Sequence, residues 1–99
     1  MFDPSLPYRR APRVALRPEP FGALAYDFGT RRLSFLKTKL LVDVVQRLER
    51  CPDVPSALTE AGVPGQQWRS YLSALAGLAD TGLIEPRESS AGVTEEDVL

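Results

Sequence analysis

Hydrophobic and polar residues alternate in two neighbouring segments of the chain, residues 23–28 and 32–36. A period of two residues is typical of a β-strand with one buried face. In the first segment the large apolar residues hold every second position, so we expect Leu24, Tyr26 and Phe28 to be the buried ones. The pattern predicts two antiparallel strands joined as a hairpin.

A turn and a third strand complete the predicted sheet. Gly29 lies between the two segments and adopts positive φ without steric cost, which suits the turn of the hairpin. Upstream, residues 14–17 form a further short strand segment, ended by Pro18 and Pro20, which have no N–H to donate. Three strands are enough for a small antiparallel sheet when a helix covers one face.

Apolar residues recur at helical spacing over most of the second half of the chain. Thr38 is a suitable N-cap for a first helix over residues 39–50. Asp53 caps a short second helix that Gly62 ends, and a third helix is predicted over residues 66–81. The fold is therefore predicted to be α+β and winged-helix-like, with a three-stranded antiparallel sheet followed by three helices.

The third predicted helix carries more apolar surface than a small core requires. Its apolar residues cover an arc of roughly 200°, whereas burial on a small core needs about 100°. We therefore expect one margin of this helix to contact something other than its own core, with Trp68 and Tyr71 either in the core or at a partner. The apolar positions are Trp68, Tyr71, Leu72, Ala74, Leu75, Ala76, Leu78 and Ala79.

Composition and charge limit the classes of function. The chain has 99 residues and a net charge of −1, so it fits one domain and lacks the basic excess of small nucleic-acid binders. No apolar segment approaches the ~20 residues that span a membrane, and residues 1–13 lack the apolar core of a signal peptide. One cysteine permits no internal disulfide, so we expect a cytoplasmic protein.

The two ends of the chain differ in composition from the middle. Residues 1–13 contain three prolines and three arginines, which predicts a flexible basic lead, either solvated or in contact with an acidic partner. Residues 87–99 are acidic, contain Ser and Gly and have no helical or strand period, which predicts a disordered tail. The folded domain is therefore expected to span residues 14–86.

The chain has few residues of the kinds that enzymes and metal sites use. It has no histidine, the commonest general base and metal ligand, and Cys51 therefore lacks its usual activating partner. Asp27, Asp43 and Asp80 are spread over different predicted elements, without a paired carboxylate or a nucleophile–base arrangement. We expect no catalytic residue, no metal and no cofactor.

Two segments carry a resemblance to a known family. They are Tyr26–Leu36, YDFGTRRLSFL, ahead of the first helix, and Leu75–Pro86, LAGLADTGLIEP, at the end of the domain. With the order of elements, they make residues 14–86 similar to the PqqD-like RiPP recognition elements, and within these to the peptide chaperones of mycofactocin biosynthesis. One departure is Lys39, because family members commonly have proline directly after the Ser/Thr cap of the first helix.

The resemblance implies a non-catalytic peptide chaperone without an iron–sulfur cluster or a SAM site. Such domains bind the leader of a precursor peptide as an added strand along the third strand, in a groove walled by the third helix. They then present the peptide to a radical SAM maturase. The partners implied are an MftA-like precursor peptide and an MftC-like maturase.

The same mechanism follows from the residues themselves. An edge strand offers unpaired N–H and C=O groups that a peptide satisfies by β-augmentation. A shift of one residue exchanges the two faces of a strand, so the sequence does not determine which face borders the groove. Arg31 and Arg32 either pair with an acidic leader or protect the edge by charge. The expected peptide-binding residues are Arg31, Arg32, Leu33, Ser34, Phe35, Leu36, Trp68, Tyr71, Ala74, Leu75 and Leu78.

Two alternatives remain open on the sequence. A DNA-binding winged helix would read bases with its third helix, but Arg69 is the single cation that this helix presents. An exposed edge strand also favours pairing with a second copy, so a homodimer through this strand is the alternative assembly.

Overall fold

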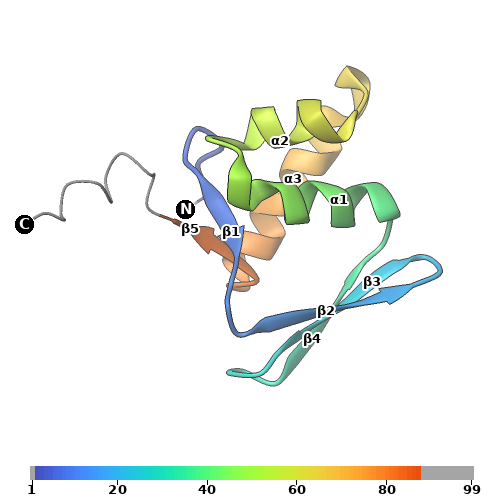
Figure 1. Cartoon of the computed structure of the whole chain (residues 1–99), viewed down its shortest axis with the longest axis vertical. Helices are drawn as coiled ribbons and strands as arrows, with labels where there is room; N and C mark the ends of the chain where they lie inside the picture. Colours follow the sequence, from blue (N-terminus) through green and yellow to red (C-terminus); the bar gives the residue numbers. More distant parts are fainter. Residues whose placement is uncertain (1, 88–99) are drawn as a thin grey trace, which may run out of the picture.

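The computed structural model describes residues 2–87. In this part of the chain a three-stranded antiparallel sheet, in the order β2-β3-β4, precedes three α-helices, and β1 pairs with β5 in a separate two-stranded sheet (Figure 1). The predicted order of three strands followed by three helices in an α+β fold is confirmed. The elements are β1 (Tyr8–Arg10), β2 (Val14–Glu19), β3 (Gly22–Asp27), β4 (Arg32–Leu36), α1 (Lys39–Arg47), α2 (Val54–Ala61), α3 (Trp68–Asp80) and β5 (Ile84–Pro86), with 3₁₀ turns at Leu48–Arg50 and Gly65–Gln67.

Small residues, not large ones, form the inner face of β3. Ala23 and Ala25 are 1% exposed and lie on the face that packs against α1. Their short side chains leave room for the helix to approach the sheet closely. The prediction that Leu24, Tyr26 and Phe28 form the buried face is therefore wrong, because they line the outer face of the sheet, which points away from the helices (Figure 1).

A buried aspartate holds the turn between β3 and β4. Asp27 is 6% exposed, and its Oδ1 accepts hydrogen bonds from the backbone N–H groups of Gly29 at 2.8 Å and Thr30 at 3.1 Å. Arg13 Nε lies 3.1 Å from both carboxylate oxygens. The residue with positive φ is Arg31, at 63°, and not Gly29 as predicted. At Gly29 the absence of a side chain matters for space instead, since a Cβ there would lie 2.9 Å from the Arg13 side chain and would make that side chain shift.

The starts of α1 and α2 and the end of α2 lie at the capping residues that the sequence indicated, whereas α1 ends at Arg47 rather than residue 50 and α3 spans Trp68–Asp80 rather than residues 66–81. At the start of α1, the backbone N–H of Leu41 donates to Thr38 Oγ1 at 3.0 Å. At the start of α2, the backbone N–H of Ser56 donates to Asp53 Oδ1 at 2.9 Å. Gly62 ends α2 in the left-handed conformation, at φ 83°. These local bonds satisfy backbone groups that a helix end leaves unpaired.

The N-terminal segment belongs to the fold, which corrects the prediction of a flexible lead over residues 1–13. β1 pairs with β5, with Arg9 opposite Glu85 and its Nη2 2.7 Å from the carboxylate. Tyr8 and Ala11 are 2% and 0% exposed. A strand of three residues is too short for its alternation to stand out among prolines and arginines. The folded unit therefore includes β1 as well as the predicted domain.

Arg87 lies at the end of the described chain. Its guanidinium donates to the backbone carbonyls of Tyr8, Leu48 and Cys51, at 3.0, 3.3 and 2.6 Å. These bonds tie the segment after β5 to β1 and to the end of the first helix. The rest of the predicted tail, residues 88–99, lies outside the described residues.

Candidate functional site

The strand β4 has one free edge. It pairs with β3, and no other strand within residues 2–87 pairs with its second side. At the opposite edge of the sheet, β2 contains Pro18, which has no N–H to offer, whereas β4 contains no proline. Among the described strands of this sheet, β4 is therefore the edge better suited to pair with an added strand.

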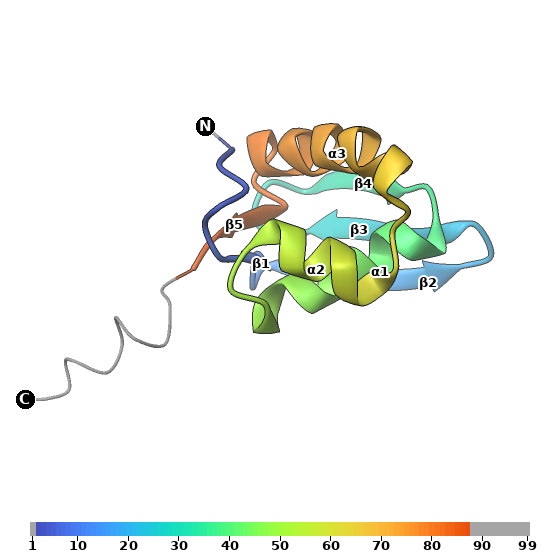
Figure 2. The same ribbon diagram turned by 90° about the horizontal axis from the view of Figure 1, so that it is seen from above.

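The helix α3 lies alongside β4 (Figure 2). The hydroxyl of Tyr71, in α3, is 3.2 Å from Oγ1 of Thr38, two residues beyond β4. Leu36 of β4 and Leu75 of α3 are both fully buried in the core. The helix thus stands beside the free edge at a distance fixed by core packing and by one side-chain hydrogen bond.

A small pocket of about 150 Å³ opens where the end of β4 meets α3. This volume is below the ~300 Å³ of typical small-molecule sites and suits a single side chain instead. Tyr71 and Ala74, two of the predicted residues, line it. The other lining residues, which sequence reasoning missed, are Lys37, Thr38, Leu41 and Ser70. The spacing of four residues between Ser70 and Ala74 was the available signal, because it places both on one face of a helix.

The predicted residues of β4 fall on two faces of the sheet. Leu36 is fully buried and Ser34 is half-buried, so the face with Arg32, Ser34 and Leu36 turns toward the helices. Leu33 and Phe35 lie on the outer face and are 53% and 56% exposed. Leu36 therefore supports the site from beneath and offers no surface of its own to a bound molecule.

The predicted residues of α3 are divided between the core and the margin that faces β4. Leu75 is 0% exposed, so, like Leu36, it supports the site from the core and offers no surface to a bound molecule. Trp68 is half-buried, and its Nε1 donates to the backbone carbonyl of Val63 at 2.9 Å, which anchors the indole to the turn before α3. Its hydrogen bond and its packing against the core assign it a structural role.

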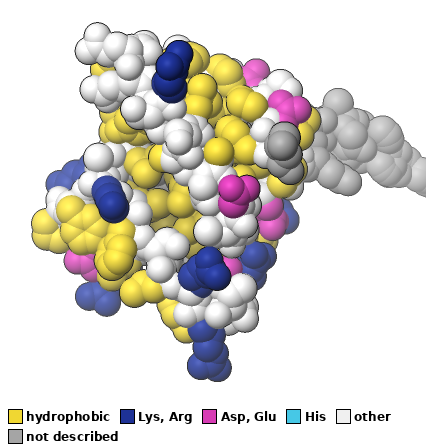
Figure 3. Space-filling view, turned by 180° about the vertical axis from the view of Figure 1, so that it is seen from behind, with side chains coloured by type: hydrophobic (Ala, Val, Ile, Leu, Met, Phe, Trp, Pro, Cys, Tyr) yellow, Lys and Arg dark blue, Asp and Glu magenta, His cyan; other side chains and the backbone are white. Residues whose placement is uncertain are grey.

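Three residues of α3 remain accessible on one side of the helix. Ala74 is exposed, and Tyr71 and Leu78 are half-buried. Their spacing of three and four residues places them in one row along the helix. Figure 3 shows hydrophobic side chains exposed on this side of the molecule, between lysine and arginine side chains. We call the free edge of β4 together with Tyr71, Ala74 and Leu78 the groove.

Two arginines stand at the start of β4. Arg31 lies in the turn and Arg32 begins the strand, and both are exposed. Neither forms an ion pair within residues 2–87, whereas Arg13 and Arg17 of the same region pair with carboxylates. The groove therefore has a positively charged end.

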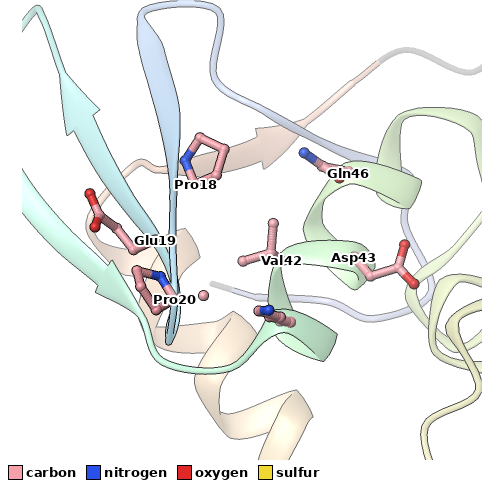
Figure 4. A pocket seen from close by; sticks show the side chains of 8 residues that line it. Pro18, Glu19, Pro20, Val42, Asp43 and Gln46 are labelled. Atoms are coloured by element: carbon pink, nitrogen blue, oxygen red, sulfur yellow. The ribbon is translucent and has the colours of Figure 1, made fainter.

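A larger hollow of about 470 Å³ lies between the β2–β3 turn and α1. Figure 4 shows Pro18, Glu19 and Pro20 on the sheet side and Val42 and Asp43 on the helix side. The sequence did not indicate this hollow, because its residues come from two distant segments and share no chemistry. Within residues 2–87, no group of three or more His, Cys, Asp or Glu side chains is placed to hold a metal ion.

The single cysteine is not placed for nucleophilic chemistry. Cys51 is 1% exposed. Burial, and then the neighbouring carboxylate of Glu60, raise the pKa of the Cys51 thiol above its ordinary value. The thiolate, which is the nucleophilic form, is therefore scarce near neutral pH.

The fold and the site define a small α+β domain with an open sheet edge beside a helix. The peptide chaperone MftB family matches residues 7–85, and the chain belongs to this family. None of the helices in residues 2–87 is long and apolar enough to cross a membrane.

Named relatives agree with this assignment. The chain is 49% identical over 89 residues to the peptide chaperone MftB of Mycobacterium tuberculosis, covering 90% of this chain and 82% of that protein. It is 51% identical over 85 residues to the peptide chaperone MftB of Mycolicibacterium smegmatis, covering 86% and 83%. No solved structure matches the chain significantly. Because a peptide chaperone has a non-catalytic role, the expectation of a protein that is not an enzyme is confirmed.

Proposed function

We propose that the chain acts as a peptide chaperone in mycofactocin biosynthesis, which binds an MftA-like precursor peptide and delivers it to an MftC-like radical SAM maturase. Membership of the peptide chaperone MftB family supports a peptide as the partner. The free, buried Cys51 fits the reducing cytoplasm, where we place this step.

The observation that carries the proposal is the free edge of β4 beside α3. In this proposal the leader of the precursor adds to β4 as a further strand. Main-chain hydrogen bonds then provide affinity with little dependence on the peptide sequence. Peptide side chains on the inner face point toward Tyr71, Ala74 and Leu78, and one of them enters the pocket of about 150 Å³.

Charge at the start of β4 adds selectivity to the main-chain hydrogen bonds between the peptide and β4. Arg31 and Arg32 are exposed and have no ion-pair partner among the described residues. A carboxylate in the leader accepts charge-assisted hydrogen bonds from one of these guanidinium groups. The proposal therefore favours a leader that combines an extended apolar segment with an acidic residue near one end.

An NMR titration of the isotope-labelled chain with a synthetic MftA-like precursor peptide tests the proposal. We expect shift changes to cluster on residues 32–36 and 70–78, and a scrambled peptide of the same composition to cause much smaller changes. A folded sample that shows no shift changes with the precursor would contradict the proposal. Changes confined to the hollow of about 470 Å³ would place the peptide between the β2–β3 turn and α1 instead of in the groove.

A further inference from the structure

The outer face of the three-stranded sheet carries exposed apolar side chains that no element within residues 2–87 covers. Of the five large hydrophobic residues that are exposed in this part of the chain, four lie on or beside this face. Single exposed apolar residues are common, but several together mark a contact surface. The four are Phe21, Phe28, Leu33 and Phe35, which are 44%, 65%, 53% and 56% exposed.

These side chains form one continuous patch. In the register of β3 and β4, Leu24 lies opposite Phe35 and Tyr26 lies opposite Leu33, so the four share a face. The ring of Phe21 lies 6.1 Å from that of Phe35, and the ring of Tyr26 lies 4.8 Å from that of Phe28. The outer patch, as we call it, consists of Phe21, Leu24, Tyr26, Phe28, Leu33 and Phe35.

Basic side chains border the outer patch. Arg17 lies opposite Leu24 in the sheet, and its side chain is 78% exposed. Arg31 is exposed in the turn at the other end. Glu19 pairs with Arg17 at 3.1 Å and offsets part of its charge, but the Glu19 side chain is only 20% exposed. Asp27 is buried on the inner face, and Arg31 forms no ion pair among the described residues, so the exposed charge around the patch is positive on balance. A second copy would present the same net positive border to this one, whereas a partner with carboxylates around an apolar surface would be complementary.

We propose that the outer patch is the docking surface for the maturase, through an apolar surface of that enzyme bordered by carboxylates. This inference rests on the proposed function. The strand β4 belongs to both surfaces, because its edge takes the peptide while Leu33 and Phe35 point outward beside that edge. Alternate side chains of a peptide strand on β4 emerge on the same outer face. A docked maturase thus contacts the chaperone and the bound peptide together.

The test uses the full chain with Phe21→Ser and Phe28→Ser combined, which leaves β4 and α3 unchanged. Leu6→Ser is the matched control, because Leu6 is 40% exposed and lies outside the sheet. Affinity for the purified maturase and affinity for the precursor peptide are measured separately by calorimetry. We expect the double variant to lose at least tenfold in maturase affinity and to keep peptide affinity within about twofold, with Leu6→Ser unchanged in both.

A second variant, Arg17→Glu, tests the charged border without removing apolar surface. It should weaken maturase binding several-fold at low salt, with a smaller effect at high salt. Wild-type maturase affinity in the double aromatic variant would overturn the inference. A wild-type dimer that this variant converts to a monomer, measured by light scattering, would show that a second copy occupies the patch. If the wild-type chain did not bind the precursor peptide while the maturase affinities changed as expected, the proposed function would be contradicted and the docking surface would be supported.

Discussion

The hydroxyl of Tyr71 lies 3.2 Å from Oγ1 of Thr38, the residue that also caps α1. One threonine therefore joins the end of β4, the start of α1 and the side of α3. Because Thr38 is two residues beyond the free edge of β4, this contact helps to set the width of the groove. Its position links a local capping signal in the sequence to the geometry of the proposed peptide site.

Replacing Tyr71 by phenylalanine removes this link and keeps the ring. Thr38 still accepts the Leu41 N–H, so the start of α1 remains capped. We expect the free energy of unfolding to fall by about 1 kcal/mol or less, as is usual for one hydrogen bond between partly exposed groups. Peptide affinity should fall several-fold because α3 is held less firmly beside β4. Urea denaturation and calorimetric titration measure the two effects, and unchanged peptide affinity would contradict the role given to this contact.

A charge placed in the groove should block the peptide. Ala74 is exposed and lines the pocket of about 150 Å³. Ala74→Glu fills the pocket with a carboxylate, and an apolar peptide side chain has no hydrogen bond to offer it. We therefore expect at least a tenfold loss of peptide affinity. Ser73→Glu is the matched control, because Ser73 is exposed on the same helix and points about 100° away. Equal losses in the two variants would mean that the groove is misplaced.

The order of elements was predictable because local signals fix it. Thr38, Asp53 and Gly62 mark helix ends through bonds to residues three or four positions away. The buried face of β3 was not predictable, because a period of two defines two faces without saying which one a helix covers. β1 was missed because its partner, β5, lies more than seventy residues further along the chain.

The candidate site was predictable to a similar degree. The helical spacing of Tyr71, Ala74 and Leu78 indicated the side of α3 that lies next to β4. It did not distinguish these residues from Leu75, whose burial depends on contacts with the whole core. The outer patch was missed because Tyr26 and Phe28 were expected in the interior, while Leu33 and Phe35 were expected to bind the peptide.

The conformation of Arg31 predicts that replacing this residue by glycine weakens peptide binding without lowering the stability of the fold. Arg31 has φ of 63°, a region that costs a residue with a side chain about 1–2 kcal/mol. Arg31→Gly removes this cost but gives the unfolded chain more freedom, worth roughly 0.5–1 kcal/mol. We expect the free energy of unfolding to stay the same or rise by up to about 1 kcal/mol.

In the same variant, peptide affinity should decrease and depend less on salt, because one guanidinium partner for an acidic leader is lost. Arg69→Ala is the control for a lost cation, since Arg69 is exposed on α3 away from the groove. A clear loss of stability in Arg31→Gly, without a change in affinity, would show that this arginine serves the turn alone.

The environment of Asp27 predicts how stability depends on pH. Burial alone would raise the pKa of Asp27, but the hydrogen bonds from Thr30 and Gly29 and the guanidinium of Arg13 together lower this pKa below its ordinary value. An aspartate in the unfolded chain titrates near about pH 3.9. Because the pKa is lower in the folded state, the carboxylate stabilises the fold above about pH 4, and this contribution is lost as the pH falls through the folded pKa.

Asp27→Asn removes that contribution at every pH. We expect the variant to be less stable than the wild type at pH 7, and the difference between the two to shrink as the pH is lowered below about 4. Urea denaturation midpoints between pH 2.5 and 7 measure this difference. Asp80→Asn is the control, because Asp80 is exposed and forms no ion pair within residues 2–87. If the denaturation midpoints of Asp27→Asn and the wild type differed by a constant amount down to pH 2.5, the charge of the carboxylate would not be what holds the turn. The lost stability would then come from a poorer fit of the amide side chain.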